Sequence, residues 1–288
     1  MLICRTIADI RAAVAGWRAV GQSVALVPTM GALHAGHAAL MAAARAGHDR
    51  VVATIFVNPT QFGNPLDLLA YPRTEAADTA LLHRSGVDAV FIPDAAEIYP
   101  PGDETIVETT RLAARFHGTV RPGHFRGVAT VVTRLFNIAQ PDTAFFGEKD
   151  YQQLAVIRRM VRDLQMPLTI RGVPTMREVD GLAMSSRNVR LTPQDRAAAP
   201  VLSRALDAAA RLAGTGAQVQ DLDAAIRATI AAEPRARLQG CDIVWAADFT
   251  PAAGPLLARV GIMISASFGP TDTPVLLIDQ RELDPIGG

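Results

Sequence analysis

Short apolar runs alternate, along the first part of the chain, with stretches whose apolar residues recur at helical spacing. The runs lie at residues 24–27, 51–57, 88–92, 143–146 and 168–173. Helical patterns lie at residues 37–46, 74–85, 128–139 and 151–164, and Gly47 and Gly86 stand where helix C-caps are expected. The alternation predicts an α/β fold, a Rossmann-like doubly wound parallel sheet with helices on both faces. Ligands of such sheets bind beyond the carboxyl ends of the strands.

The pattern changes near Asn188. Helical spacing continues over residues 193–213 and, after a Gly-Thr-Gly break, over residues 222–232. Strand-like runs follow at residues 242–246, 261–268 and 275–278. We therefore predict two domains. They are a Rossmann-like catalytic domain over residues 1–188 and a smaller α+β C-terminal domain, expected to act as a lid, over residues 189–288.

The sequence PTMGALHAGH, at residues 28–37, connects the first apolar run to the first helical pattern. His34 and His37 therefore stand where a buried strand turns into a helix. Such a junction presents backbone N–H groups and the positive end of the helix dipole. Gly31 and Gly36 let the backbone approach a ligand closely. An HxGH sequence alone also occurs in ordinary helical proteins, but in this context it predicts a nucleotide-phosphate site.

A second segment, FFGEKDYQQL, contains the single lysine of the chain, and the other 27 basic residues are arginines. The compact ammonium of Lys149 suits a phosphate, and a broad guanidinium would not replace it well. Asp150 can accept hydrogen bonds from ribose hydroxyls, and Gly147 is compatible with a close approach of the backbone to a ligand. We expect Gln152 to be an ordinary surface residue and Gln153 to face the site as a neutral amide donor.

A third segment, GLAMSSRN, lies on a polar loop at residues 181–188. Its two adjacent hydroxyls and Arg187 form a triplet suited to phosphate, although the same triplet occurs in ordinary loops. Together with the HxGH it predicts a nucleotidyl-transfer site. The helix start would align the α-phosphate, and the loop would clamp the β- and γ-phosphates as pyrophosphate departs.

Composition limits the class of partner. Lys+Arg equals Asp+Glu at 28 each, which gives no global attraction toward nucleic acid or a membrane. Cys4 and Cys241 provide neither a disulfide framework nor a metal-binding spacing. The N-terminus has no long apolar segment after a basic start, and no run approaches the length of a membrane span. We expect a cytoplasmic protein that acts on small molecules.

Six motifs, in this order along the chain, resemble the pantothenate synthetase (pantoate–β-alanine ligase) family of the HxGH nucleotidyltransferase superfamily. They are PTMGALHAGH, FVNPTQFG, YPRT, RPGHFRGV, FFGEKDYQQL and GLAMSSRN, and together they cover residues 24–190. Related nucleotidyltransferases share the HxGH but not the other motifs. The C-terminal DIVWAADFTP and SFGPTDTPVLLIDQ depart from the family's usual sequence, so no site residue is carried over from them.

The resemblance implies an ATP-dependent condensation of (R)-pantoate with β-alanine. The pantoate carboxylate would attack the α-phosphate of ATP, pyrophosphate would leave, and a pantoyl adenylate would remain. The amine of β-alanine would then attack this anhydride to give pantothenate and AMP. Because charge accumulates on phosphoryl oxygens in the first step, fixed donors and cations are the groups that lower its barrier.

The resemblance also implies the residues that contact ATP. They are Met30, Gly31, His34, His37, Gly147, Glu148, Lys149, Asp150, Met176, Met184, Ser185, Ser186 and Arg187. Among these, His37 takes the family's proton-donor role, and His34, Lys149 and Arg187 are the other catalytic candidates.

The remaining ligands are assigned in the same way. Gln61, Gln153 and Arg121 are expected to bind pantoate, and Gln61 also faces the β-alanine site. Asp78 is expected to anchor Mg²⁺ directly or through water, since a hard cation prefers carboxylate oxygen. The family further suggests a homodimer.

Several residues that could carry chemistry are interpreted as structural. We expect surface, capping, loop-shaping or packing roles for His48, His83, His117, His124, Trp17, Trp245, Asn58 and Pro59.

Other functions stay open at the level of sequence. A nucleotidyltransferase of the same superfamily could load an alcohol phosphate with CMP or AMP and would need no amine. A nucleotide-sensing module would bind ATP without releasing pyrophosphate, and replacement of His37, Lys149 or Ser186 would favour it. A tRNA-charging enzyme is disfavoured by the neutral charge and by the lack of an RNA-binding domain.

Overall fold

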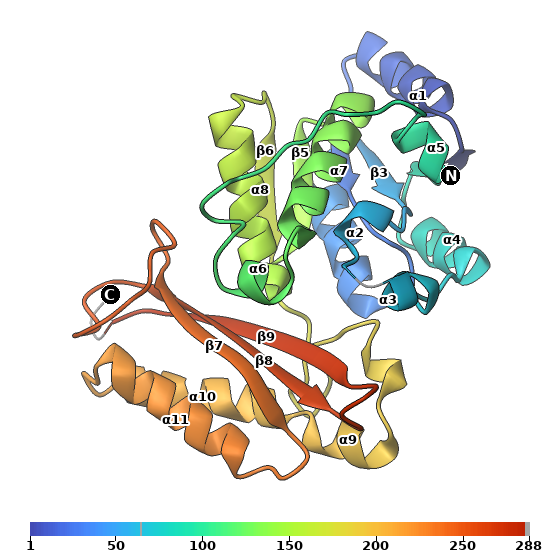
Figure 1. Cartoon of the computed structure of the whole chain (residues 1–288). Helices are drawn as coiled ribbons and strands as arrows, with labels where there is room; N and C mark the ends of the chain where they lie inside the picture. Colours follow the sequence, from blue (N-terminus) through green and yellow to red (C-terminus); the bar gives the residue numbers. More distant parts are fainter. Residues whose placement is uncertain (64, 286–288) are drawn as a thin grey trace. The chain divides into compact units, whose positions relative to one another are not determined.

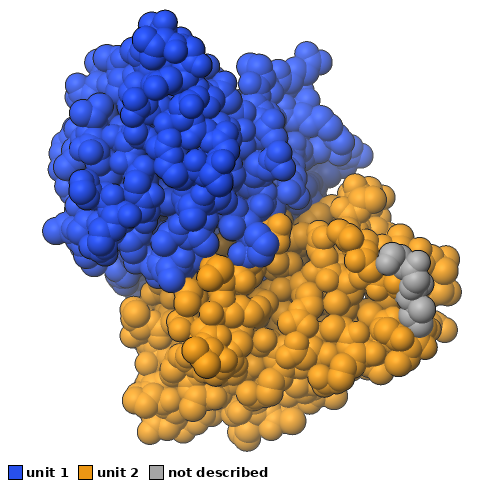
Figure 2. Space-filling view, turned by 180° about the vertical axis from the view of Figure 1, so that it is seen from behind, with its two compact units in different colours: residues 1–147, 152–174 blue, residues 148–151, 175–288 orange. Residues whose placement is uncertain are grey.

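The computed structural model describes residues 1–63 and 65–285 and contains two compact units, coloured separately in Figure 2. Residues 1–147 and 152–174 form the first unit, and residues 148–151 together with the chain from Thr175 onward form the second. The chain thus passes between units three times. The domain boundary predicted at residues 188 and 189 lies later than the last of these crossings and stays a prediction. Residues 286–288 of the predicted C-terminal domain lie outside the described residues.

The first unit is built on a six-stranded sheet in which every described strand pair is parallel. Its order is β1-β4-β3-β2-β5-β6. The strands are β1 (Leu2–Cys4), β2 (Val24–Val27), β3 (Arg50–Thr54), β4 (Ala89–Phe91), β5 (Thr143–Gly147) and β6 (Thr169–Val173). From β2 the chain proceeds outward through β3 and β4 on one side and later through β5 and β6 on the other. The order therefore reverses between β2 and β5, which is where open α/β sheets bind ligands.

Helices lie on both faces of this sheet, as the doubly wound prediction requires (Figure 1), and alternate residues of its central strands pack into different apolar clusters. In β2, Val24 and Leu26 pack into one apolar cluster, and Ala25 and Val27 pack into another. The first cluster includes helices α1 (Ile7–Ala19), α7 (His124–Ala139) and α8 (Tyr151–Asp163), and the second includes α2 (Ala35–Gly47) and α4 (Glu75–Arg84). The predicted Rossmann-like arrangement is confirmed.

The short elements of this unit lie on the loops between its strands and main helices. They are η1 (Pro59–Gln61), α3 (Pro65–Leu69), α5 (Ala95–Ile98) and α6 (His117–Val120). Among the described residues, no helix is both long enough and apolar enough to span a membrane.

The N-terminal elements β1 and α1 are absent from the sequence prediction. Helix α1 has a start signal that the apolar pattern alone does not use. The Thr6 side chain accepts from the backbone N–H of Asp9, and the Asp9 carboxylate accepts from the backbone N–H of Thr6. Strand β1 has only three residues, and Leu2 and Ile3 are exposed, so it lacks the buried run that marks the other strands.

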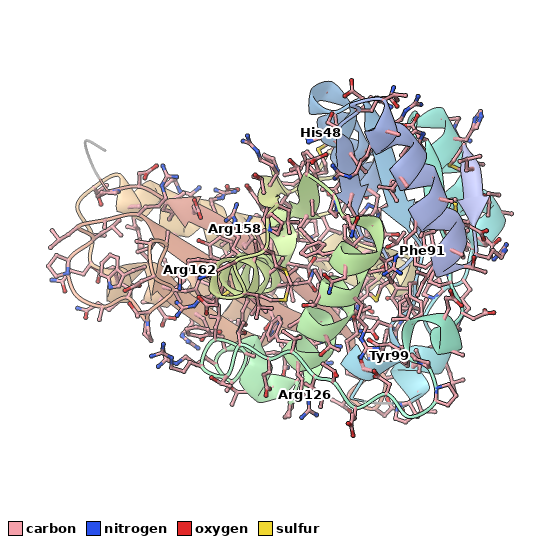
Figure 3. All side chains as sticks on the ribbon, turned by 90° about the horizontal axis from the view of Figure 1, so that it is seen from above. His48, Phe91, Tyr99, Arg126, Arg158 and Arg162 are labelled. Carbon is pink, nitrogen blue, oxygen red and sulfur yellow. The ribbon has the colours of Figure 1, made fainter. Side chains whose placement is uncertain are left out.

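The two glycines predicted as helix C-caps, Gly47 and Gly86, each lie one residue away from the C-cap of the structure. Helix α2 ends at Gly47, and the C-cap is His48, one residue beyond the predicted position. His48, labelled in Figure 3, thus has the capping role expected for it, and its ring lies edge-on to that of Phe145 with the centroids 5.7 Å apart. Gly86 follows the C-cap of α4 with φ +74°, the left-handed conformation that glycine adopts without strain.

The second unit contains a three-stranded antiparallel sheet in the order β7-β8-β9. Its strands are β7 (Arg237–Trp245), β8 (Val260–Phe268) and β9 (Val275–Leu283). Two helices, α10 (Val201–Ala213) and α11 (Val219–Ala231), share one apolar cluster with these strands. The smaller α+β domain is therefore present, with longer β7 and β9 strands than the sequence pattern predicts.

The long helix predicted over residues 193–213 is wrong. The chain forms α9 (Pro193–Ala198) and α10, and Pro200 stands between them as the N-cap of α10. Proline lacks the N–H that a continuous helix would need at this point, so the chain turns there.

Gly261 in β8 faces Tyr151, and a methyl group there would come within 2.4 Å of the tyrosine ring. Gly261→Ala should therefore lower the free energy of unfolding by about 1–3 kcal/mol, the usual cost of overpacking. Gly16→Ala in α1, where nothing lies within 4 Å of an added methyl, is the matched control and should be neutral or stabilising by up to about 1 kcal/mol. Chemical denaturation measures both; equal stability of Gly261→Ala and the parent protein would contradict this packing.

Candidate functional site

The turn between β2 and α2 carries the HxGH motif and begins at the switch point of the sheet. Gly31 and Ala32 have φ of +84° and +52°, so two successive residues adopt the left-handed conformation. Alanine rarely adopts this conformation, which indicates that neighbouring groups hold the turn in place.

The group that holds this turn is the carboxylate of Asp78, which is 2% exposed. Its two oxygens accept hydrogen bonds from the backbone N–H groups of Ala32 (3.0 Å) and Leu33 (2.8 Å). The Thr74 hydroxyl adds a third hydrogen bond of 3.1 Å. A methyl group on Gly31 would lie 3.0 Å from Oδ2 of Asp78, so glycine allows this close approach. Asp78 thus fixes the backbone conformation directly before the first histidine.

The two histidines are half-buried, and hydrogen bonds from nearby backbone N–H groups determine which ring nitrogen of each carries the proton. Nδ1 of His34, the N-cap of α2, accepts from the backbone N–H of Gly36 at 3.1 Å. Nδ1 of His37 accepts from the backbone N–H of His34 at 3.2 Å. Because Nδ1 is the acceptor in both rings, the proton of each neutral imidazole lies on Nε2. The rings, with centroids 4.2 Å apart, therefore offer two Nε2–H donors at the start of one helix.

The turn after β3 presents Gln61, which is 8% exposed. Its Oε1 accepts from Nδ2 of Asn58 at 3.0 Å, and its Nε2 lies 3.1 Å from the sulfur of Met30. Nδ1 of His124 donates to the backbone carbonyl of Gln61 at 2.9 Å, since a carbonyl oxygen can only accept. These contacts agree with the loop-shaping roles expected of Asn58 and His124.

Helix α7 approaches this turn closely at Gly127. A methyl group there would meet the Thr60 carbonyl oxygen at 2.5 Å and the Gln61 nitrogen at 2.7 Å. The motifs FVNPTQFG and RPGHFRGV, far apart in the sequence, therefore meet backbone to backbone. Arg121, predicted to bind pantoate, is the half-buried C-cap of α6 and lies three residues before the first residue of α7.

The two adjacent glutamines of α8 differ from the expectation. Gln153 is half-buried in the first turn of the helix, whereas Gln152 is 3% exposed. Nε2 of Gln152 donates to the carbonyls of Leu112 and Arg115, and its Oε1 accepts from the backbone N–H of His117. The prediction of a surface role for Gln152 is wrong, because its buried amide pairs with three backbone groups of the irregular segment before α6 and of the first residue of α6.

Lys149 and Asp150 belong to the second unit, in the short helix η2 (Glu148–Asp150). The Lys149 side chain is 18% exposed, and its ammonium lies 3.7 Å from the Asp150 carboxylate. The next residue, Tyr151, donates its hydroxyl to Glu282 of β9 at 2.6 Å and packs against Phe249. The lysine is therefore attached through Tyr151 to the antiparallel sheet.

The GLAMSSRN segment also belongs to the second unit. Arg177, just before it, forms a bidentate pair with Asp279 at 2.7 and 2.9 Å and also donates to the Gly181 carbonyl. Ser185 accepts from the backbone N–H of Arg187 at 3.2 Å, so the Ser-Ser-Arg residues form a local turn. Met176 is exposed, and the backbone N–H of Met184 donates to its carbonyl. The predicted phosphate-binding loop thus has a fixed base and a short polar turn.

Within the described residues, no group of three or more His, Cys, Asp or Glu side chains is arranged to hold a metal ion. The oxygens of Asp78, the residue predicted to anchor Mg²⁺, already accept three hydrogen bonds. The structure shows Asp78 as the support of the HxGH turn, and its role toward a metal stays a prediction.

A parallel α/β sheet with two imidazole donors at a helix start, beside its switch point, has the features of a nucleotide-binding enzyme of the doubly wound class. Comparison with known proteins identifies the family. The model of the family "Pantoate-beta-alanine ligase" matches residues 2–282, and the chain belongs to this family.

Curated relatives agree over most of the chain. The pantothenate synthetase of Agrobacterium fabrum is 48% identical over 284 residues, covering 98% of this chain and 95% of the relative. The pantothenate synthetase of Cereibacter sphaeroides is 54% identical over 230 residues, covering 80% of this chain and 82% of the relative.

Solved structures agree as well. The pantothenate synthetase of Thermus thermophilus matches with a TM-score of 0.92 at 46% identity, covering 99% of this chain and 100% of that one. The pantoate–β-alanine ligase of Francisella tularensis, solved with β-γ ATP and β-alanine, matches with a TM-score of 0.79 at 34% identity. The match covers 98% of this chain and 97% of that one. The chain is accordingly an enzyme that ligates pantoate to β-alanine, with ATP as a substrate.

Asp78→Asn tests the support of the HxGH turn. An amide has one oxygen, so one of the N–H groups of Ala32 and Leu33 would lose its acceptor. We expect the free energy of unfolding to fall by about 1–3 kcal/mol, the cost of one unsatisfied buried donor. Exposed Asp67→Asn is the control and should change stability by no more than about 0.5 kcal/mol.

The two roles considered for Asp78 give different outcomes. A variant with the parent's melting temperature but a raised Mg²⁺ requirement would make Asp78 a metal ligand and contradict its role in the turn.

Proposed function

We propose that this enzyme activates pantoate as an adenylate before β-alanine reacts. A carboxylate oxygen of pantoate forms a bond to the α-phosphorus of ATP, and the bond from that phosphorus to the bridging oxygen breaks, releasing pyrophosphate. The neutral amine of β-alanine then attacks the acyl carbon. The acyl C–O bond breaks, AMP leaves with that oxygen, and the amine loses a proton.

The observation that carries this proposal is the pair of Nε2–H donors at the start of α2. Negative charge grows on the phosphoryl oxygens as pyrophosphate leaves, and donors fixed beforehand stabilise it without reorganisation. The α2 N-terminus adds the positive end of its dipole. We assign His37 as the proton donor and His34 as its partner; Met30 and Gly31 of the same turn are the other ATP contacts proposed here.

Neutral amides suit the acceptor substrate, a hydroxy acid without phosphate. We assign Gln61 and Gln153 to the pantoate hydroxyls and carboxylate, with Gln61 also facing β-alanine. Arg121 would offset the charge of the carboxylate. The hydrogen bonds of Gln61 to Asn58 and Met30 support this assignment, because they hold its amide in one orientation.

Residues of the second unit are also proposed to bind ATP. Lys149 provides the point charge for phosphate, and Gly147, the last residue of β5 in the first unit, is assigned to ribose and adenine. Asp150, Glu148 and Met176 are assigned to ribose and adenine, and Met184, Ser185, Ser186 and Arg187 to the departing phosphates. The low exposure of Lys149 supports the first assignment, since a partly desolvated ammonium interacts more strongly with an anion.

Mg²⁺ is expected to arrive with ATP, because this ion usually binds phosphate oxygens together with one or two carboxylates. When bound, it would neutralise charge on the leaving pyrophosphate. Asp78 is the proposed anchor, and water could link the ion to its carboxylate, whose oxygens already hold the HxGH turn. A homodimer and a cytoplasmic location complete the proposal.

The order of the two steps can be tested by isotope exchange. Labelled pyrophosphate should enter ATP in the presence of pantoate and absence of β-alanine, because the adenylate forms before the amine is needed. Exchange that strictly requires β-alanine would contradict the two-step scheme.

The same assay tests the histidines. His37→Ala should lower the pantoate-dependent exchange rate by at least about a hundredfold, the scale of losing one transition-state donor. His83→Ala, an exposed histidine in the last turn of α4, is the control and should exchange like the parent protein. Near-normal exchange by a folded His37→Ala variant would make His37 a structural residue.

A further inference from the structure

A chain of hydrogen bonds connects Gln61, through the buried Asn58, to the half-buried Tyr99, the C-cap of α5. The Tyr99 hydroxyl lies 2.8 Å from Oδ1 of Asn58, and Nδ2 of Asn58 lies 3.0 Å from Oε1 of Gln61. Asn58 is 1% exposed, so bulk water does not compete for these bonds. Tyr99 thus connects to Gln61 through a single intervening side chain.

The direction of each bond in this chain follows from the backbone of α7. The carbonyl oxygen of Gly127 can only accept, and it lies 3.1 Å from the Asn58 amide, which must therefore turn its Nδ2 toward it. The Asn58 oxygen then accepts from the backbone N–H of Thr60 at 3.3 Å and faces the hydroxyls of Tyr99 and of Thr60, the latter 2.9 Å away. Both hydroxyls donate to this oxygen, so they hold the amide in the same orientation that Gly127 requires.

The orientation of the Asn58 amide determines that of the Gln61 amide. The second hydrogen on Nδ2 of Asn58 meets Oε1 of Gln61, so the Gln61 amide must turn its Nε2 the other way, toward Met30. Gln61 accordingly presents N–H donors, the polarity that recognises a carboxylate or hydroxyl oxygen. If the Asn58 amide were reversed, its oxygen would face the carbonyl oxygen of Gly127 and Oε1 of Gln61, and its N–H₂ group would face the backbone N–H of Thr60.

The ring of Tyr99, which is labelled in Figure 3, makes contacts with two neighbouring side chains. The guanidinium carbon of Arg134, on α7, lies 4.6 Å from the centre of the Tyr99 ring, and Phe56 lies on the same ring with centroids 6.3 Å apart. Arg134 also donates to the Ile98 carbonyl at 2.6 Å and to Asp103. Burial raises the pKa of the Tyr99 hydroxyl above its usual value, so the group keeps its proton, and remains a donor, at neutral pH.

We propose that Tyr99 is a positioning residue for pantoate, because its hydroxyl donates to Oδ1 of Asn58 and so stabilises the orientation of the Asn58 amide on which the donor polarity of Gln61 depends. The inference rests on the pantoate-binding role proposed above for Gln61. Tyr99 itself need not touch the substrate.

Tyr99→Phe removes the hydroxyl and keeps the ring between Arg134 and Phe56. Asn58 retains Thr60 and Gly127 as partners, so the fold should persist. We expect the KM for pantoate in the exchange reaction to rise about 5- to 30-fold, which corresponds to the loss of about 1–2 kcal/mol from one buried hydrogen bond. The KM for ATP should change less than about twofold. A purely packing role for Tyr99 would leave the KM for pantoate unchanged, and that result would overturn the inference.

Asn58→Asp gives a second and stronger test of whether Gln61 must present its N–H donors to pantoate. An aspartate cannot donate to Gly127 or to Gln61, so Gln61 would turn its N–H groups toward the new carboxylate and its oxygen toward pantoate. The KM for pantoate should rise more than in Tyr99→Phe. A smaller rise would contradict the argument from bond direction.

The variant Gln61→Ala, alone and combined with Tyr99→Phe, separates this inference from the proposed function. If Gln61→Ala leaves the KM for pantoate unchanged, the proposed role of Gln61 fails. If Gln61→Ala raises it and Tyr99→Phe does not, only the role of Tyr99 fails. Where Tyr99 acts through Gln61, adding Tyr99→Phe to Gln61→Ala should change the KM for pantoate less than about twofold further, since the two substitutions remove the same interaction.

Discussion

A single buried carboxylate, that of Asp78, determines the geometry of the turn on which the catalytic proposal depends. It binds the backbone N–H groups of Ala32 and Leu33 and is supplied by α4, a different helix from the one that the histidines begin. The left-handed conformation of Ala32 is unfavourable on its own and is stabilised by these bonds. Because the turn is fixed, His34 enters α2 as its N-cap, and the two Nδ1 atoms can accept from the helix backbone. The reactive edges of both rings follow from that one constraint.

Backbone groups also orient the uncharged side chains of the site, those of Gln61 and Asn58. Gln61 is an uncharged amide that could present either its oxygen or its nitrogen to a substrate. Its polarity follows from Asn58, and that of Asn58 follows from a backbone carbonyl that can only accept. Both halves of the site in the first unit thus use main-chain groups of known polarity to orient side chains whose polarity would otherwise be ambiguous. A fully connected polar network of this kind is rigid because every alternative leaves a buried group unpaired.

Much of this could be read from the sequence because the relevant signals are local. Strand β2 is predicted with its observed bounds, since four apolar residues buried on both faces form a continuous run. The HxGH turn follows directly after it, so its place at the sheet edge was predictable. The RPGHFRGV motif was predictable as sequence, but its backbone contact with Gln61 was not, because the two segments are brought together only by packing.

The features that sequence reasoning missed depend on tertiary contacts or on weak local signals. Gln152 looks like any glutamine at a helix start, and only the fold shows that three backbone groups of a distant loop need it. Tyr99 belongs to no motif and becomes informative only beside Asn58. Strand β1 pairs with β4 at the edge of the sheet and has too few residues for any period. Helix α1 could have been found from the reciprocal Thr6 and Asp9 capping pair.

The central claim is that a carboxylate oxygen of pantoate attacks the α-phosphorus of ATP at the start of α2. The most direct measurement uses pantoate with ¹⁸O in its carboxylate and determines the mass of the AMP formed in a complete reaction with β-alanine. If the adenylate forms and its acyl C–O bond then breaks, AMP must carry one oxygen from the pantoate. Labelled AMP is the result that the account predicts. Unlabelled AMP, together with normal formation of pantothenate, would contradict it.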